Sequence, residues 1–262
     1  MQLKFLTELK RLNKYICGQT AKCVVTVDMG LYKLIQQLVM SRSDLRGWWI
    51  LRPGELHIAF AFICATVSFV DGTGLPDLWS SVYSDSIVSS IIDGKNFRRS
   101  LEAHVCTLVA RQKCYFAAFF EHHQTLRTAV NKTVQEVCNG FNSDASGCAV
   151  ETLKAAMDAW DLARLIKTFE ERECESKHTF RMIRQYIHMV ELLLLFIRAT
   201  RTGNWRLHLV SVEQMVKYFF ALDLTNYSGM MAWYLAEMYT LKDSDPDSWK
   251  EFGREIGLSV EA

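Results

Sequence analysis

The chain has 262 residues, 50% of them hydrophobic, and its 30 Lys and Arg nearly balance its 29 Asp and Glu. Such a composition excludes a disordered chain, and the near-neutral charge argues against a protein that coats DNA over a large surface. The start "MQLKFLTELKRLNKY" has no apolar signal segment, and no apolar run reaches the length of about 20 residues that a membrane helix needs. We therefore expect an intracellular protein with reduced cysteines and no membrane partner.

The first third of the chain predicts alternating helices and strands. Leucines at helical spacing favour a helix up to about Gly18. The run "KCVVTVD" is apolar and β-branched, which is typical of a strand buried on both faces. A predicted helix over 29–41 separates it from a second strand in "GWWILRPGELH", and a buried helix over 58–70 follows. Strand, helix and strand in this order predict two parallel strands.

The remaining two-thirds of the chain are predicted to be helical. Strand signals nearly vanish after Leu75, and "NGFNSDASG" (139–147) and "KDSDPDS" (242–248) are the clear breaks. The predicted fold class is therefore mixed α and β, predominantly helical, with a small parallel sheet. The expected long helices are Phe97–His123, Thr125–Cys138, Gly147–Cys174, Thr179–Thr200, His208–Leu222 and Asn226–Tyr239.

Asp28 ends the first predicted strand and directly precedes a predicted helix. Ligands of open parallel sheets bind outside the carboxyl ends of the strands, and a carboxylate there can hold Mg²⁺ together with water and phosphate oxygens. The same carboxylate can instead cap the next helix by accepting a backbone N–H bond from Gly30 or Leu31. The sequence leaves both interpretations open.

Three more side chains are candidate metal ligands. Glu55 and His57 follow the second predicted strand and can face the same crevice as Asp28. Glu213 lies at the edge of an apolar stripe on the predicted helix 208–222, from which its carboxylate can point along the sheet toward Asp28. A solvated position on the flank of that helix is the alternative for Glu213.

Four residues are candidates for contact with nucleic acid. Lys95, Arg98 and Arg99 form a basic cluster around the start of a predicted helix, where they can meet phosphate or remain solvated. Trp205 can stack on a nucleobase or pack in the core.

Several phrases in a fixed order resemble an uncharacterised family of eukaryotic transposon-derived proteins, related to transposases with an RNase H-like (DDE-type) core. The resemblance implies metal-dependent nuclease or transposase chemistry on DNA, in which carboxylates hold two Mg²⁺ or Mn²⁺ ions. It assigns catalytic roles to Asp28 and Glu213, with Glu55 and His57 as weaker metal ligands. The phrases are "VTVDMGLYKL", "GELHIAFAFI…DGTGL", "DGKNFRRSLEAH", "LLLLFIRATRTGNWRLHL" and "YFFALDLTNYSGMMAWYLAEM".

The resemblance also implies a division of the chain. Residues 1–75 would form the first part of a reduced RNase H-like core, and residues 76–200 a large helical insertion. Residues 201–240 would be helices that return to the core, and residues 241–262 a tail. By the same resemblance, the nucleus is the expected compartment.

The chain departs from the family pattern in ways that predict lost activity. Only about 22 residues precede the first strand, so the β-hairpin that should carry a first catalytic aspartate has no counterpart. Leu56 and Leu222 stand where the family has Phe and His. We therefore expect a truncated, catalytically defective transposase remnant that uses Mg²⁺ or Mn²⁺ only if active.

The competing interpretation is a non-enzymatic helical module whose C-terminal helices bind another protein. Exposed aromatic side chains in "YFFALDLTNYSGMMAWYL" would favour the module. Burial of that segment against the strands would favour the core.

Overall fold

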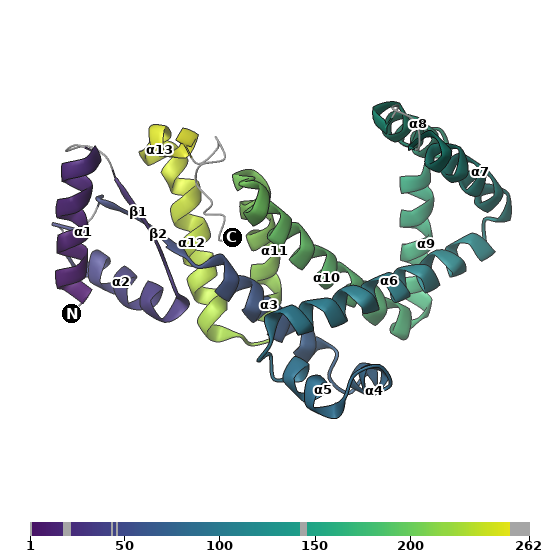
Figure 1. Cartoon of the computed structure of the whole chain (residues 1–262), viewed down its shortest axis with the longest axis horizontal. Helices are drawn as coiled ribbons and strands as arrows, with labels where there is room; N and C mark the ends of the chain where they lie inside the picture. The colour runs from purple at the N-terminus through teal and green to yellow at the C-terminus, as the bar shows by residue number, and fades with distance from the viewer. Residues whose placement is uncertain (1, 18–21, 43, 46, 142–145, 252–262) are drawn as a thin grey trace. The chain divides into compact units, whose positions relative to one another are not determined.

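The computed structural model describes residues 2–17, 22–42, 44–45, 47–141 and 146–251, which form a mostly helical chain with one small sheet (Figure 1). Two compact units are present. Unit 1 comprises Met1–Ala103 and Met189–Ala262, and unit 2 comprises His104–His188. The separate unit therefore has narrower bounds than the helical insertion predicted over 76–200. In the described part of the chain, no helix combines the length and the apolar character that crossing a membrane requires.

The predicted order of elements at the start of unit 1 is confirmed. β1 and β2 pair in parallel, and the register runs from Cys23 opposite Trp49 to Val27 opposite Pro53. The first helix ends one residue before its predicted limit, and the helix after β2 begins three residues earlier than the apolar run suggests. The elements are α1 (Gln2–Cys17), β1 (Cys23–Val27), α2 (Met29–Ser41), β2 (Trp49–Pro53) and α3 (Glu55–Phe69).

The burial of the two strands differs from the sequence prediction. In β1 the exposure alternates along the strand, and Val24 is 48% exposed, so the expectation that this strand is buried on both faces is wrong. Every residue of β2 is buried instead. Because strand burial depends on which helices pack against the sheet, the apolar composition of β1 alone could not identify the covered strand.

The C-terminal helices complete the core of unit 1. Phe219 and Tyr234 are fully buried in the same hydrophobic cluster as Ile50 of β2 and Phe62 of α3. Glu237 accepts a hydrogen bond of 2.6 Å from the Gln36 amide, which joins the last long helix to α2. The helices involved are the end of α10 (His178–Thr202), α11 (Trp205–Ala221), α12 (Thr225–Ser244) and α13 (Pro246–Glu251), so the predicted break at 242–248 shrinks to Asp245.

Two apolar runs that are too short to span a membrane, 58–70 and 190–197, contribute to the core. In α3, Ile58, Phe62 and Ala65 are fully buried, and in α10 the same holds for Val190 and Leu193. Two short helices follow α3 in a region where the sequence analysis predicts no element. These are α4 (Leu75–Ser80) and α5 (Asp85–Ile92).

Unit 2 is a helical unit with an aromatic core. Phe119 and Phe169 are buried and contact each other edge to face, with ring centroids 5.4 Å apart. The predicted helix 147–174 is divided at Trp160 and Asp161. Of the predicted loop 139–147, residues 139–141 and 146–147 are helical and 142–145 lie outside the described residues. The unit contains most of α6 (Phe97–Glu121) and the first part of α10, with α7 (Gln124–Phe141), α8 (Ser146–Ala159) and α9 (Leu162–Ser176) between them.

Gly94 joins α5 to α6 at a position where any side chain would be crowded and strained. Its φ angle is 64°, and a Cβ atom there would lie 2.6 Å from the Cys64 sulfur on α3. Gly72 also has a positive φ angle, of 70°, but a Cβ atom at Gly72 would meet no atom within 4 Å.

We predict that Gly72→Ala lowers the free energy of unfolding by about 1 kcal/mol, which is the backbone cost of a positive φ angle. Gly94→Ala should cost about 1–3 kcal/mol more, because the added methyl group overpacks the contact with α3. Urea unfolding of both variants measures the difference. Equal losses would show that this contact does not restrict the turn.

Candidate functional site

The parallel register brings the two predicted strand ends together. The Gly54 amide donates a 2.7 Å hydrogen bond to the Val27 carbonyl, so Asp28 and Gly54 adjoin at the carboxyl edge of the sheet. A pocket of about 340 Å³ opens there, and it contains Asp28, Glu55 and His57, as the sequence analysis expected. Its other lining residues are Thr26, Val27, Gly54, Leu56, Ala59, Phe97, Phe196, Ile197, Thr200 and Arg201.

Asp28 is the N-cap of α2, which confirms one of its two predicted roles. Its Oδ1 accepts a 2.8 Å hydrogen bond from the Leu31 amide, and its backbone carbonyl accepts the amide of Tyr32. The side chain is exposed at the pocket. Because the cap uses Oδ1, Oδ2 is the oxygen that would meet a cation.

Glu55 is committed to a buried ion pair rather than to the pocket. Its carboxylate accepts a hydrogen bond from the guanidinium of Arg52, and both side chains are almost completely buried. The Arg52 guanidinium also lies over the ring of Trp205, 5.5 Å from its centroid. A carboxylate whose charge is already balanced in this way is a poor ligand for a divalent cation.

Arg52 is the important residue that the sequence analysis missed. A signal was present, because a basic residue within an apolar strand is followed three positions later by an acidic residue. Buried arginines are nearly always paired, so this spacing could have indicated the ion pair.

Glu213 and His57 occupy different surroundings. His57 is exposed in the first turn of α3 and lines the pocket. Glu213 is exposed on α11, where its carboxylate accepts a 3.0 Å hydrogen bond from the Tyr239 hydroxyl of α12, and it does not line the pocket. The structure thus joins three of the four predicted metal ligands in one pocket and places Glu213 at another contact.

A buried polar cluster lies behind the ion pair. The ring of His208 stacks on Trp205 with centroids 5.4 Å apart, and its Nε2 is 3.2 Å from the Tyr234 hydroxyl. Burial, together with the nearby Arg52 charge, lowers the pKa of His208 to about 3. Burial also raises the pKa of Tyr234. Both side chains therefore stay neutral at physiological pH, and Arg52 and Glu55 provide the charges of this cluster.

The four candidate nucleic-acid contacts do not form one surface, because Trp205 is separated from the three basic residues by its burial. Trp205 is 4% exposed and packs in the core, which was one of its two predicted roles, so it is not available to stack on a nucleobase. Lys95 pairs with Asp93 at 2.6 Å and Arg99 with Glu102 at 3.1 Å, on the surface. Arg98 is exposed beside them. The arginine that lines the same pocket as Asp28 is instead Arg201, which the sequence analysis did not consider.

The donor set does not fit a two-metal centre. Such a centre needs several carboxylates that share the ions. Here Asp28 offers one oxygen and His57 one imidazole, whereas Glu55 is neutralised by Arg52 and Glu213 bonds to Tyr239. No cluster of three or more His, Cys, Asp or Glu side chains suited to a metal occurs within the described segments.

The comparisons with known proteins give one family. Residues 6–260 match the model of a family described as "Domain of unknown function (DUF8702)". No curated protein and no solved structure matches the chain.

We predict that Arg52→Met lowers the free energy of unfolding by about 3–5 kcal/mol, because it leaves the Glu55 carboxylate buried without a counter-charge. The double variant Arg52→Met with Glu55→Gln should recover part of this loss. Arg99→Met removes the exposed ion pair between Arg99 and Glu102, which has the same sequence spacing as Arg52 and Glu55. This variant should hardly change the free energy of unfolding. Chemical denaturation of the wild type, Arg52→Met, Glu55→Gln, the double variant and Arg99→Met measures the coupling, and simple additivity of the losses of Arg52→Met and Glu55→Gln would contradict it.

We also predict a pH dependence that originates at His208. Its pKa is about 3 when folded and about 6.5 when unfolded, so the unfolded chain binds more protons between these values and stability falls as the pH falls below 6.5. For His208→Gln, the stability lost between pH 7 and pH 5 should be smaller by about 2 kcal/mol. His178→Gln, which replaces an exposed histidine, is the matched control. An unchanged pH dependence in His208→Gln would show that His208 is not the responsible group.

Proposed function

We propose that the chain, which belongs to the DUF8702 family, is a transposon-derived protein with a reduced RNase H-like core and defective metal-dependent DNA chemistry. The ordered motifs of the sequence support the ancestry. The parallel strands support it further, because they place Asp28 at the carboxyl edge of a sheet, where such cores hold a carboxylate. DNA as a partner and a nuclear location are proposals that rest on the motifs.

The observation that carries the functional part of the proposal is the buried ion pair between Arg52 and Glu55. It withdraws the second carboxylate at the sheet edge from any cation. The late-helix carboxylate of Glu213 is held by Tyr239. Phosphodiester cleavage by two metal ions would have to depend on Asp28 alone, and a single carboxylate cannot hold two ions in the geometry that in-line displacement needs.

The remaining groups of the pocket suit a phosphate better than a metal pair. Arg201 and His57 are exposed at its rim, and Thr26 adds a hydroxyl group, whereas the Thr200 hydroxyl donates to the Phe196 carbonyl. Leu56, which replaces the family's Phe, also lines this pocket. We propose that the pocket can meet a DNA phosphate without cleaving it.

The C-terminal helices do not favour the alternative of a protein-interaction module. In the segment 218–235, Phe219, Met231 and Tyr234 are fully buried in the core that also contains β2. Phe220 is 59% exposed and Trp233 is 42% exposed, on different helices. Burial of this segment against the strands favours the interpretation as an RNase H-like core over that as an interaction module.

We predict that Asp28 acts only as a helix cap. Asp28→Asn keeps a capping oxygen and should retain stability, whereas Asp28→Ala should lose about 1 kcal/mol. Mn²⁺ and Mg²⁺ should shift the melting temperatures of wild type and Asp28→Asn equally, because no metal depends on the carboxylate. Thermal unfolding with and without metal measures this, and incubation of the wild type with single- and double-stranded DNA and Mn²⁺ should give no cleavage.

Two results would contradict the proposal. One is metal-dependent DNA cleavage that Asp28→Asn abolishes. The other is a melting temperature that rises with Mn²⁺ in the wild type but not in Asp28→Asn.

A further inference from the structure

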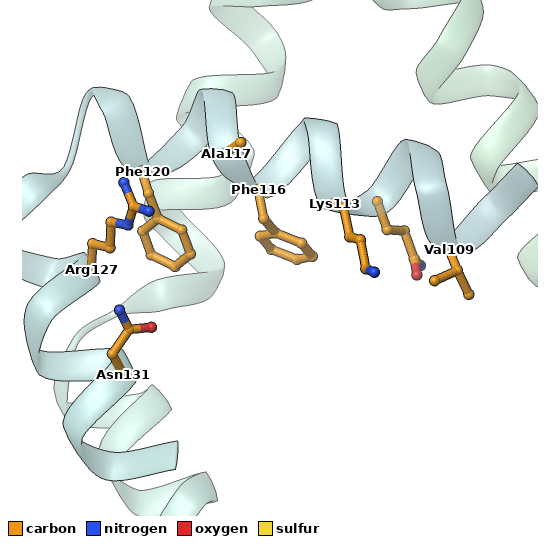
Figure 2. A pocket seen from close by; sticks show the side chains of 8 residues that line it. Val109, Lys113, Phe116, Ala117, Phe120, Arg127 and Asn131 are labelled. Carbon is orange, nitrogen blue, oxygen red and sulfur yellow. The ribbon is translucent and has the colours of Figure 1, made fainter. Parts of the chain in front are cut away.

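A second pocket lies within unit 2 and shares no lining residue with the pocket at Asp28. It has a volume of about 450 Å³ and forms an open groove along α6 and the start of α7. Figure 2 shows Val109, Lys113, Phe116 and Phe120 of α6 directed to the same side of that helix, with Arg127 and Asn131 of α7 at one end. The lining residues are Val109, Gln112, Lys113, Phe116, Ala117, Phe120, Arg127 and Asn131.

The groove uses a face of α6 that unit 2 leaves open. The six lining residues of α6 follow helical spacing from Val109 to Phe120, which corresponds to a stripe about 17 Å long. The buried residues of the same helix, such as Leu108 and Phe119, belong to another face. Val109 is 47% exposed and Phe116 is 40% exposed. The stripe therefore presents accessible apolar side chains next to the polar side chains of Gln112 and Lys113.

The charged side chains that line the groove are all basic. Lys113 and Arg127 are exposed in it, and none of its lining residues is acidic. Neither cation pairs with a carboxylate among the residues that the structure describes, whereas most other basic side chains of unit 2 do. Those pairs are Lys132–Glu136, Lys154–Glu151, Arg164–Asp161, Lys167–Glu171, Arg172–Glu173, Lys177–Glu173 and Arg184–Glu170.

We propose that this groove docks an acidic amphipathic helix of a partner protein. Apolar side chains at positions i, i+3 or i+4, and i+7 of that helix match a stripe of three helical turns formed by Val109, Phe116 and Phe120. Acidic side chains on its flanks meet Lys113 and Arg127 and supply the missing negative charge.

Two other occupants fit the groove less well. A second copy of the chain would present the same uncompensated cations to Lys113 and Arg127, and like charges at an interface are unfavourable. A nucleic acid would meet only two cations along the stripe, and Val109 and Ala117 offer it neither charge nor an aromatic ring. The proposal is independent of the proposed DNA-related function, because it uses residues of unit 2 only.

The test uses a fluorescently labelled synthetic peptide of about 14 residues, long enough to cover the stripe. Leucines lie at i, i+3, i+4 and i+7, glutamates flank them, and the ends are acetylated and amidated. A second peptide has lysines in place of the glutamates, and a thymidine oligonucleotide of about 12 bases represents single-stranded nucleic acid. Fluorescence anisotropy measures the binding of each probe to the full chain.

We expect the glutamate peptide to bind the wild type with a Kd of about 10–100 μM, and the double variant Lys113→Glu with Arg127→Glu to bind it about tenfold more weakly. The lysine peptide should bind this double variant more tightly than it binds the wild type. If the substitutions simply unfolded the groove, the double variant would bind neither peptide. Phe116→Ala should also weaken the binding of the glutamate peptide. Lys167→Glu and Met157→Ala, at comparably exposed sites of unit 2, should leave it unchanged.

Three results would overturn the proposal. The first is no binding of the glutamate peptide to the wild type. The second is binding that the double variant and Phe116→Ala do not change. The third is binding of the oligonucleotide that depends on Lys113 and Arg127 and is tighter than that of the glutamate peptide.

Discussion

The burial of one cation, Arg52, is the constraint on which the structure of unit 1 depends. Arg52 is 2% exposed in a fully buried strand, where an unpaired charge would cost several kcal/mol. Glu55 of α3 balances the charge, and Trp205 of α11 and Tyr234 of α12 surround it. The strand can therefore be covered only when three helices are in place together. The same ion pair removes a carboxylate from the sheet edge, so one interaction stabilises the fold and limits the chemistry of the pocket.

Local patterns in the sequence were sufficient to predict the elements that begin and end with clear signals. The β-branched run before Asp28 and the helical spacing after it predicted β1 and α2, with the cap as one of two roles for Asp28, and the order of elements predicted the parallel pairing. The break at Asp161 was not predicted, because it has neither Gly nor Pro and instead uses an aspartate with a φ angle of 49°. The helices α4 and α5 are short and rich in Ser and Asp, so they gave little periodic signal.

The candidate site was predictable only where the backbone determines the position. Asp28, Glu55 and His57 share a pocket because strand register places the two strand ends side by side. The direction of the Glu213 side chain depends on Tyr239 of a later helix, and the role of Trp205 depends on Arg52. Such contacts join elements that are distant in the sequence, and periodicity within one element contains no information on them.

The two stretches that build unit 1 also determine the order in which the chain can fold during synthesis. Arg52 emerges from the ribosome early, but its neighbours Trp205 and Tyr234 emerge only after the whole of unit 2 has been made. Unit 2 is one continuous stretch, so it can fold before the rest of unit 1 is synthesised, while the apolar faces of the early strands are still uncovered. In a nascent chain that stalls before α11, unit 2 would therefore be folded while the core of unit 1 still lacks its C-terminal helices. Chaperones that recognise exposed apolar strands would bind β1 and β2 in that state.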